Sequence, residues 1–435
     1  MARPKKDLVP SAPLGRTAAL IAKMREGGST ICSASDVMKT WKYIDFCNPQ
    51  LNIPAIGMEW LFGARGLLAG RIIQLRATYS KGKSSFMYYM YACAQKPIID
   101  AYCYHIETEG AAAPPDFLYS FNCNPDQLAI DEVSSFEDCT AKLDTMIAWI
   151  RGGRGGGIDP ETGRTKKTKF TDPVDSDKNA PLIMGVDSLS SLGFEALVNQ
   201  DVLDMTKTAQ PGKVAKGLRE YLSERVGLFR DSQALVMLSS HETAKINTGG
   251  KKSFGQGPEK TAKAQEAIGV HATYAVDVDS HKWMDKEAGV ELGNRVTMYT
   301  FKNKLSPRYR KLEIFMRIGK GFDMVETDTN FLLTHPASPL SSDEAWRQGG
   351  INSGIKCPML SDKVFKTNED FIRTLYANTE VLMKLREKMR IRGFGFDFET
   401  KYQQQLEQAA QEEAARTGRK VDEVEVETAD PDATE

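Results

Sequence analysis

Short apolar runs alternate with segments of helical periodicity between about residues 50 and 325. This alternation is typical of a mostly parallel sheet whose strands are joined by crossover helices. The clearest strand candidates are RIIQLR (71–76), DAYCYHI (100–106), PLIMGVD (181–187) and ALVMLSS (234–240). The pattern predicts an α/β fold in which helices flank a central sheet.

Helical periodicity also marks the two ends of the chain. RTAALIAKMRE (16–26) places apolar residues at helical spacing and is followed by two glycines, which end a helix. NEDFIRTLYANTEVLMKLREKMRIR (368–392) predicts one long amphipathic helix that ends at Gly393. The predicted division is an N-terminal helical oligomerisation segment (1–48), a core (49–325), a small C-terminal domain (326–400) and a tail (401–435).

Charge and composition narrow the class of protein. The formal net charge is −1, but residues 401–435 contain ten acidic and four basic residues and few large apolar ones, which predicts a disordered acidic tail. No apolar run approaches the ~18 residues of a membrane span, and no secretory signal follows the basic N-terminus. The seven cysteines include no C-x-x-C pair, which indicates reduced thiols in a cytoplasm.

ATYSKGKSS (77–85) nearly matches a phosphate-binding loop. Such a loop needs a strand that ends in a compact turn, backbone N–H groups that face the anion, and a helix N-terminus behind them. RIIQLR supplies the strand and SSFMYYMYACAQ the helix. The predicted nucleotide-binding residues are Ala77, Thr78, Tyr79, Ser80, Lys81, Gly82, Lys83, Ser84 and Ser85. Ala77 stands where the usual pattern has glycine, which weakens the match without cancelling it.

Other predicted strands end in residues that would complete an ATPase site. Lys83 would reach the β- and γ-phosphates of ATP, and Ser84 and Asp187 would hold Mg²⁺. No glutamate follows Asp187 directly, so the catalytic base must come from elsewhere. HIETEG places Glu107 and Glu109 at the end of a neighbouring strand, where a carboxylate would activate water. The alternative is a pair of exposed glutamates.

His241 follows the fourth predicted strand and precedes a basic segment. Residues 244–265 contain five lysines, one glutamate, four glycines and the aromatic Phe254. This composition predicts a loop that orders on a phosphate backbone, with Phe254 stacking against bases. His241 would report the γ-phosphate to this loop, so ATP would bias DNA affinity. The alternatives are a polar surface histidine and a solvated loop.

The order of these parts, over residues 16–325, resembles the RecA family of recombinases, most closely its phage branch, the UvsX-like proteins. Glu109 in ETEGA matches the family's catalytic glutamate, GVDSLSSL matches its second ATPase motif, and His241 stands where the phage branch carries histidine. GMEWLFGARGLLAGRIIQL (57–75) looks like the entry to the family core, and DMTKTAQPGKVAKGLRE (204–220) resembles the region of the first DNA loop. The resemblance implies a RecA-like P-loop core that uses ATP and Mg²⁺.

The resemblance also implies roles for residues far from the phosphate loop. Lys302 and Lys304 in KNK would reach the nucleotide of a neighbouring subunit, and strand alternation puts them on one face with Asn303 on the other. Phe117, in a Pro-x-aromatic turn, would lie against adenine. The implied catalytic residues are Glu109, Lys83, His241, Lys302 and Lys304. The implied DNA-binding residues are Lys207, Lys213, Lys245, Lys251, Lys252, Phe254 and Lys260.

Together these features predict an ATP-dependent recombinase that forms helical filaments on single-stranded DNA and exchanges strands with duplex DNA. A loading mediator and a single-strand-binding protein are further candidate partners, no membrane is involved, and the compartment is the host cytoplasm if a phage encodes the protein. The glycine-rich insertion at 151–180 has no counterpart in the family; a surface loop is favoured over an added DNA or partner contact. The alternative functions are a RecA-like hexameric helicase and a non-catalytic regulatory paralogue.

Overall fold

The computed structural model describes most of the chain between residues 41 and 391. The described residues are 23–24, 41–110, 112–158, 165–193, 213–244, 260–262, 265–285, 289–340, 344–347 and 354–391. The chain forms two compact units, residues 1–42 and residues 43–435, and the elements below belong to the second. In the predicted helix 16–26, only Lys23 and Met24 are described, and both are helical. The predicted domain limits stay a prediction.

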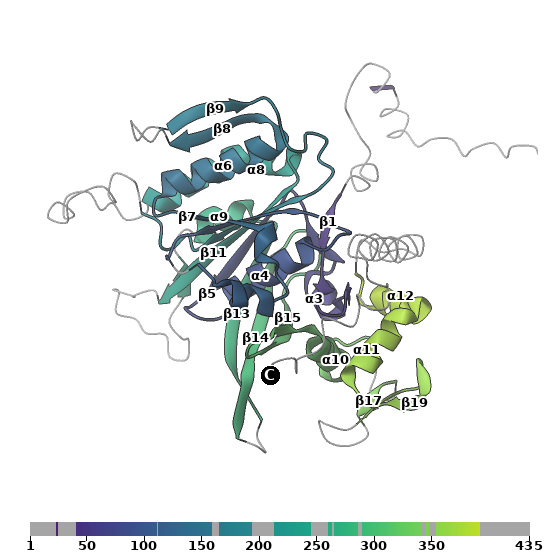
Figure 1. The fold of residues 1–435 in the computed structure, drawn as a ribbon. Coiled ribbons are helices and arrows are strands. Elements are labelled where there is room, and N and C mark those ends of the chain that lie inside the picture. Colours follow the sequence, from purple (N-terminus) through teal and green to yellow (C-terminus); the bar gives the residue numbers. More distant parts are fainter. Residues whose placement is uncertain are drawn as a thin grey trace, which may run out of the picture. The chain divides into compact units, whose positions relative to one another are not determined.

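A ten-stranded sheet forms the centre of this second unit (Figure 1). Its strands are, in order across the sheet, β16 (Gly321–Asp323), β15 (Arg310–Arg317), β14 (Val290–Asn303), β13 (Tyr274–Asp285), β5 (Ile72–Ala77), β11 (Ala234–Ala244), β10 (Leu182–Asp187), β6 (Tyr102–Glu107) and β7 (Leu128–Glu132), with β12 (Lys260–Ala262) paired to β11. The strands from β13 to β7 are parallel, and β14 to β16 continue the sheet in antiparallel fashion. The four predicted strands are therefore confirmed as β5, β6, β10 and β11.

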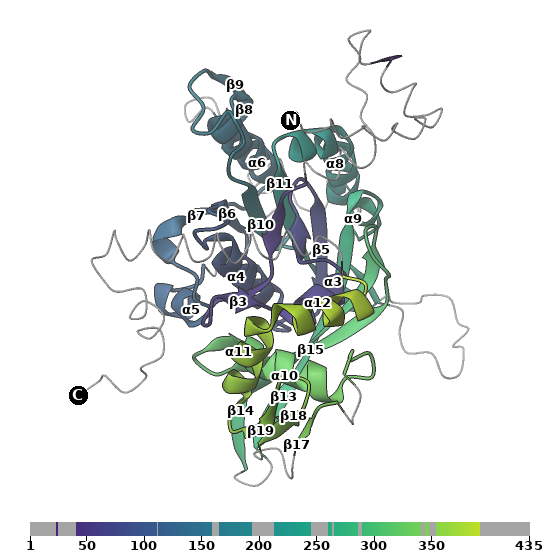
Figure 2. The same ribbon diagram turned by 90° about the vertical axis from the view of Figure 1, so that its right-hand side faces the viewer.

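Helices cover both faces of the sheet (Figure 2). One face carries α3 (Ile56–Phe62), α4 (Lys83–Ala94), α5 (Pro115–Ser120) and, from the C-terminal part, α10 (Met324–Thr334), α11 (Asn368–Ala377) and α12 (Thr379–Lys388). The other face carries α6 (Phe136–Arg151), α8 (Lys213–Asp231) and α9 (Gln265–His271). Helix α4 is buried on nearly all sides, which explains why its sequence is apolar all round.

The connections after two adjacent strands leave the sheet in opposite directions. β5 leads into α4 on one face, whereas its neighbour β11 is followed by α9 on the other face. In open α/β sheets, ligands bind in the crevice that forms outside the carboxyl ends of strands at such a point. The topology alone therefore directs attention to the ends of β5 and β11.

The C-terminal part packs onto the core through a buried polar cluster formed by Glu59, Asp328 and Arg386. The Arg386 guanidinium donates two hydrogen bonds of 2.8 Å to the Glu59 carboxylate, and both side chains are 1% exposed. Asp328 accepts hydrogen bonds from the N–H groups of Ile56 and Gly57 at the start of α3. Below, this group is called the C-terminal cluster.

Short strands complete the unit, and two sequence predictions need correction. The short sheets are β1 (Tyr43–Asp45) with β4 (Gly66–Leu68), β2 (Cys47–Asn48) with β3 (Ile53–Pro54), and β17 (Trp346–Arg347), β18 (Ile355–Cys357) and β19 (Ser361–Phe365) together. The single helix predicted at 368–392 is wrong, because Asn378 ends α11 and its side chain caps α12 by accepting from the N–H of Val381.

The insertion at 151–180 is not a plain surface loop. It contains an antiparallel hairpin formed by β8 (Gly153–Ile158) and β9 (Thr165–Phe170). The glycine content hid the extended segments, because glycine is uncommon inside strands. As to membranes, none of the helices described has both the length and the apolar character of a transmembrane span.

Candidate nucleotide-binding site

The loop between β5 and α4 has the backbone of a phosphate-binding turn. Gly82 lies in the left-handed region with φ of 96° and directly precedes α4, and Ser80 has φ of 55°. Ala77 is still part of β5, where it pairs with His241, and its φ is negative. The departure from glycine at this position therefore needs no unusual conformation, and backbone geometry is compatible with the alanine side chain.

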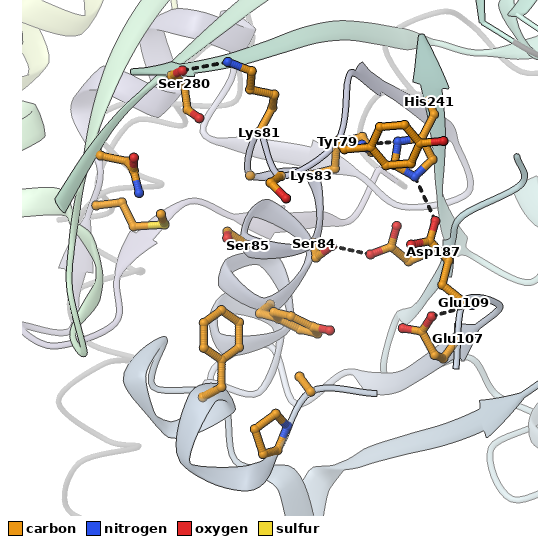
Figure 3. Close-up of a pocket in the computed structure, with 18 residues that line it drawn as sticks. Tyr79, Lys81, Lys83, Ser84, Ser85, Glu107, Glu109, Asp187, His241 and Ser280 are labelled. Atoms are coloured by element: carbon orange, nitrogen blue, oxygen red, sulfur yellow. Dashed lines mark hydrogen bonds and ion pairs between the residues drawn. The ribbon is translucent and has the colours of Figure 1, made fainter. Parts of the chain in front are cut away.

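Lys83 is the first residue of α4, directly after the loop, and its side chain is buried. Its Nζ atom is 3.1 Å from the carbonyl oxygen of Thr78 and 3.1 Å from Nδ1 of His241. Both partners are polar protein atoms, and Lys83 and His241 line a cavity (Figure 3). Phosphate oxygens are stronger partners for an ammonium group than these atoms, so the lysine is placed to bind an anion in the cavity.

Ser84 and Asp187, the predicted Mg²⁺ ligands, lie beside each other. The Ser84 hydroxyl donates to the Asp187 carboxylate, whose other oxygen accepts from Ser239 at 2.5 Å. His105 and Glu107 place further ligand atoms within 4.8 Å of Asp187. Hydroxyl and carboxylate oxygens are the ligands that Mg²⁺ prefers, so Ser84, Glu107 and Asp187 fit the ion that ATP hydrolysis requires, whereas the imidazole of His105 does not.

Glu109 is held by three polar side chains. Its Oε1 atom is 2.8 Å from Nε2 of His241, 2.7 Å from the Ser188 hydroxyl and 3.1 Å from the Ser191 hydroxyl. Burial alone would raise the pKa of Glu109, but hydrogen bonds from Ser188, His241 and Ser191 outweigh burial and lower the pKa below its usual value. The carboxylate form is therefore favoured, as a general base requires.

Glu107 supports the segment that carries Glu109. The Glu107 carboxylate accepts the backbone N–H of Glu109 at 2.7 Å and lies 3.7 Å from Nε2 of His105. Burial opposes ionisation of Glu107, yet the nearby His105 side chain and the hydrogen bond from the N–H of Glu109 lower its pKa below the usual value. Glu107 thus positions Glu109 from within the sheet.

A pocket of about 430 Å³, which Figure 3 shows, is lined by Lys83, Ser84, Glu107, Glu109, Asp187 and His241 among others. One side carries Pro114 and Phe117, whose ring makes an edge contact with Tyr88, as an aromatic wall for a base would. The lining also includes Ser280, Asn294 and Met316 from β13, β14 and β15. Sequence reasoning missed Tyr88, Ser280, Asn294 and Met316, because no local motif marks them.

Tyr79 and Lys81 extend outward from the phosphate-binding loop. The ring of Tyr79 stacks on His241 with centroids 4.2 Å apart, although the tyrosine is 69% exposed. Lys81 lies 2.8 Å from the Asp279 carboxylate and donates to the Ser280 carbonyl, both on β13. The loop therefore contacts β11 through Tyr79 and β13 through Lys81.

Lys302 and Lys304 lie outside the pocket of their own chain. Nζ of each lysine is 3.5 Å from the Val270 carbonyl, and Lys302 also donates to the Gly269 carbonyl, near the C-terminal end of α9. Asn303 bonds instead to the Phe62 carbonyl, so the predicted alternation of faces is present. Burial and the charge of Lys304 lower the pKa of Lys302.

Most of the predicted DNA-binding residues, Lys207, Lys245, Lys251, Lys252 and Phe254, lie outside the described residues. Lys213 is the first residue of α8 and Lys260 the first of β12. Lys260 pairs with Ala244, the last residue of β11, which is three residues beyond His241. The two residues that flank segment 245–259 are therefore neighbours in the sheet.

Comparison with known proteins gives a distant but consistent relationship. No protein-family model matches the chain. The chain is 23% identical to Protein RecA of Methylobacterium sp. (strain 4-46) over 271 residues, which are 62% of this chain and 63% of that protein. It is also 23% identical to Protein RecA of Pseudomonas fluorescens (strain SBW25) over 273 residues, which are 63% of this chain and 65% of the relative. The chain therefore spans less than two thirds of these relatives; it is a distant RecA homologue, and the identity does not resolve a branch of the family.

Proposed function

We propose that this distant RecA homologue is an ATP-dependent recombinase that forms filaments on single-stranded DNA and exchanges strands with homologous duplex DNA. The observation that carries the proposal is the convergence of Lys83, Glu109, Asp187 and His241 on one pocket. The strand that bears His241 continues directly into the basic, glycine-rich segment 244–265. A nucleotide site and a DNA-binding segment would thus share one strand.

Hydrolysis would use Glu109 as the general base. Its carboxylate would take a proton from water while the water oxygen bonds to the γ-phosphorus and the bond to the β-phosphate oxygen breaks. Lys83 would stabilise the charge that develops on the leaving phosphate. Mg²⁺ held by Ser84 and Asp187 would supply further charge neutralisation. The hydrogen bonds from His241, Ser188 and Ser191 all end on Oε1 of Glu109, and the side chain is 36% exposed, so Oε2 is the oxygen that would take the proton from water.

His241 would couple the nucleotide to DNA. Its ring contacts both Lys83 and Glu109, so a γ-phosphate that binds Lys83 would change the contacts of the histidine. The backbone of His241 belongs to β11, which leads to residue 244 and the predicted DNA loop. Nucleotide state would then bias the conformation of the loop, as differential affinity for two states requires.

Electron microscopy with ATP and single-stranded DNA tests the class of assembly. Open helical filaments are expected for a recombinase, whereas closed rings would favour the hexameric helicase. A regulatory paralogue would show little DNA-stimulated ATPase, a result that the complete set of Lys83, Glu109 and Asp187 argues against. Filaments without strand exchange between homologous DNAs would refute the recombinase proposal.

The location of Lys302 and Lys304 outside the pocket suggests action on a neighbouring subunit. Subunits carrying Lys302→Ala and Lys304→Ala would be mixed with subunits carrying Glu109→Ala. Each variant alone is expected to be nearly inactive, but some interfaces of a mixed filament combine an intact Glu109 with intact lysines. Partial recovery of DNA-stimulated ATPase is expected. No recovery, although both variants bind DNA and co-assemble, would place the lysines in another role.

A further inference from the structure

The hairpin formed by β8 and β9 carries charge that the nucleotide site does not use. Its two strands contain four basic residues, Arg154, Lys166, Lys167 and Lys169, and no acidic residue. The register places Arg154 directly opposite Lys169. Like charges opposite each other destabilise an antiparallel pair, so an anion beside the hairpin would stabilise it.

Glycines occupy the positions opposite the other two lysines. Lys166 pairs with Gly157 and Lys167 pairs with Gly156. Glycine inside a strand weakens the strand but allows a ligand or another backbone to approach closely. The hairpin therefore combines positive charge with low steric bulk.

A buried ion pair fixes the base of the hairpin. The Arg151 guanidinium is 2.7 Å from the Asp175 carboxylate, with the two side chains 4% and 8% exposed, and it also donates to the carbonyl of Ser232 at 3.1 Å. Arg151 precedes the hairpin and Asp175 follows it, so both ends of the insertion are joined at one point on the core. Basic residues on an anchored hairpin lose less entropy on binding than those on a free loop.

The direction of the hairpin follows from its position beside α6. β8 follows α6 after Gly152 and runs beside it, so the hairpin folds back along the helix (Figures 1 and 2). Since α6 begins directly after β7, at the edge where the parallel strands end, the hairpin is directed toward the edge that holds the nucleotide pocket.

Acidic residues of α6 can neutralise only part of this charge. Asp144 is bound by Arg225 at 3.0 Å, and the other acids of the helix are Glu137 and Asp138 in its first turn. Residues 159–164 add Asp159, Glu161 and Arg164, so residues 153–170 contain five basic and two acidic residues and have a net charge of +3. Even if Glu137 and Asp138 each offset one basic residue, the balance stays positive.

We propose that the β8–β9 hairpin binds the phosphate backbone of duplex DNA. A strand of six residues is about 20 Å long. Duplex DNA carries one phosphate charge per ~1.7 Å of its axis, whereas each strand carries one per ~3.4 Å, so a duplex offers the hairpin about twice as many partners. The inference rests on the proposed function for its partner, and it assigns the capture of duplex DNA to a surface separate from segment 244–265.

The test uses the full-length chain and a variant with Lys166→Gln, Lys167→Gln and Lys169→Gln. A control with Lys311→Gln, Lys363→Gln and Lys366→Gln removes the same charge from exposed positions elsewhere. Affinity for a labelled duplex and for one of its strands is measured over a range of salt. For the hairpin variant, the slope of log affinity against log salt is expected to fall by about 0.9 for each duplex phosphate that the hairpin no longer binds.

The control is expected to keep the parent slope for the duplex, and both variants should keep the parent slope for the single strand. An Arg substitution at the three hairpin lysines should retain duplex binding, which shows that charge is the relevant property even if the Gln variant is less stable. An unchanged duplex slope in the Gln variant, or an equal fall in the control, would overturn the hairpin proposal. If the parent bound single strands but no duplex, only the hairpin proposal would fail; if it bound no DNA, the proposed function would fail too.

Discussion

The candidate nucleotide pocket and the C-terminal cluster both concentrate charged side chains in the interior, but they do so differently. In the C-terminal cluster, the Arg386 guanidinium and the Glu59 carboxylate face each other through two hydrogen bonds and are almost fully buried. In the pocket, Lys83 and Glu109 both contact His241 and line an open volume of about 430 Å³. In the C-terminal cluster the charges bind each other, whereas in the pocket a ligand can replace the present partners of Lys83 and Glu109.

This difference explains why buried charge alone is a poor sign of function. Burial raises the pKa of Asp328 well above its usual range, yet Asp328 accepts hydrogen bonds from N–H groups at the start of α3 and does not line the pocket. Structural clusters also perturb pKa values. What distinguishes the pocket is convergence at the ends of β5, β6, β10 and β11, where the topology opens a crevice.

The largest effect is expected for Lys83→Ala, which should leave the free energy of unfolding near that of the parent and reduce ATP hydrolysis at least about 100-fold, because a charge that stabilises the leaving phosphate is removed. Steady-state ATPase assays with single-stranded DNA measure it. Lys81→Ala, in the same loop, is the matched control and should cost no more than about tenfold, since its Nζ is engaged by Asp279. Near-parent hydrolysis by the Lys83 variant would place the nucleotide site elsewhere.

The opposite behaviour is expected for Arg386→Met. Removing the guanidinium leaves the buried Glu59 carboxylate without its ion-pair partner and should lower the free energy of unfolding by about 3–5 kcal/mol. Urea unfolding measures the loss, and the ATPase of the folded fraction should change little. Lys388→Met, which removes an exposed pair with Glu344, is the control and should cost at most about 1 kcal/mol.

A double variant tests whether Glu59 and Arg386 stabilise the C-terminal cluster as one ion pair. Adding Glu59→Gln to Arg386→Met removes the stranded charge and should restore part of the lost stability. If the double variant is as unstable as the sum of the two single variants, the pair does not act as one unit.

A smaller effect is expected from pH in the pocket. Because the pKa of Glu109 is lowered, its carboxylate persists below the usual pH of protonation, and ATPase should fall only at acid pH below that value. Ser188→Ala removes one hydrogen bond to the carboxylate and should raise the pKa of Glu109, which moves the acid limb of the pH–rate profile to higher pH. Thr140→Ser, on α6, is the control: it changes a side chain by a similar amount and should leave the pH–rate profile unchanged. If the acid limb of the profile coincides in the parent and the Ser188 variant, Glu109 is not the base.

The smallest effect concerns the segment after His241. Neutralising Lys251 and Lys252 should weaken binding to single-stranded DNA and reduce the slope of log affinity against log salt by about 0.7 for each phosphate that the segment no longer binds. Anisotropy titrations at several salt concentrations measure both quantities. An unchanged slope would mean that these two lysines do not touch DNA.

The sequence by itself determined the four central strands and the strand–turn–helix that carries the predicted phosphate-binding loop, because each of these local elements rests on neighbours in the chain. The period of apolar residues marked β5, β6, β10 and β11, and the loop needed only a turn between a strand and a helix. It also placed Asp187 at the end of β10 and Glu109 just beyond β6. His241, which the pattern placed after its strand, instead lies within β11, where it pairs with Ala77 at the end of β5. The helical period of residues 368–392 was misread as one helix, because the single residue Asn378 ends α11 and caps α12.

The tertiary structure decided everything that depends on which distant segments meet. Met316 and Asn294 enter the pocket only because β14 and β15 extend the sheet beyond β13, and no local pattern encodes that pairing. Glu59 and Arg386 are 327 positions apart, and each looks like an ordinary surface charge in the sequence. Burial in a shared low-dielectric environment makes them partners, because an unpaired charge there would cost several kcal/mol.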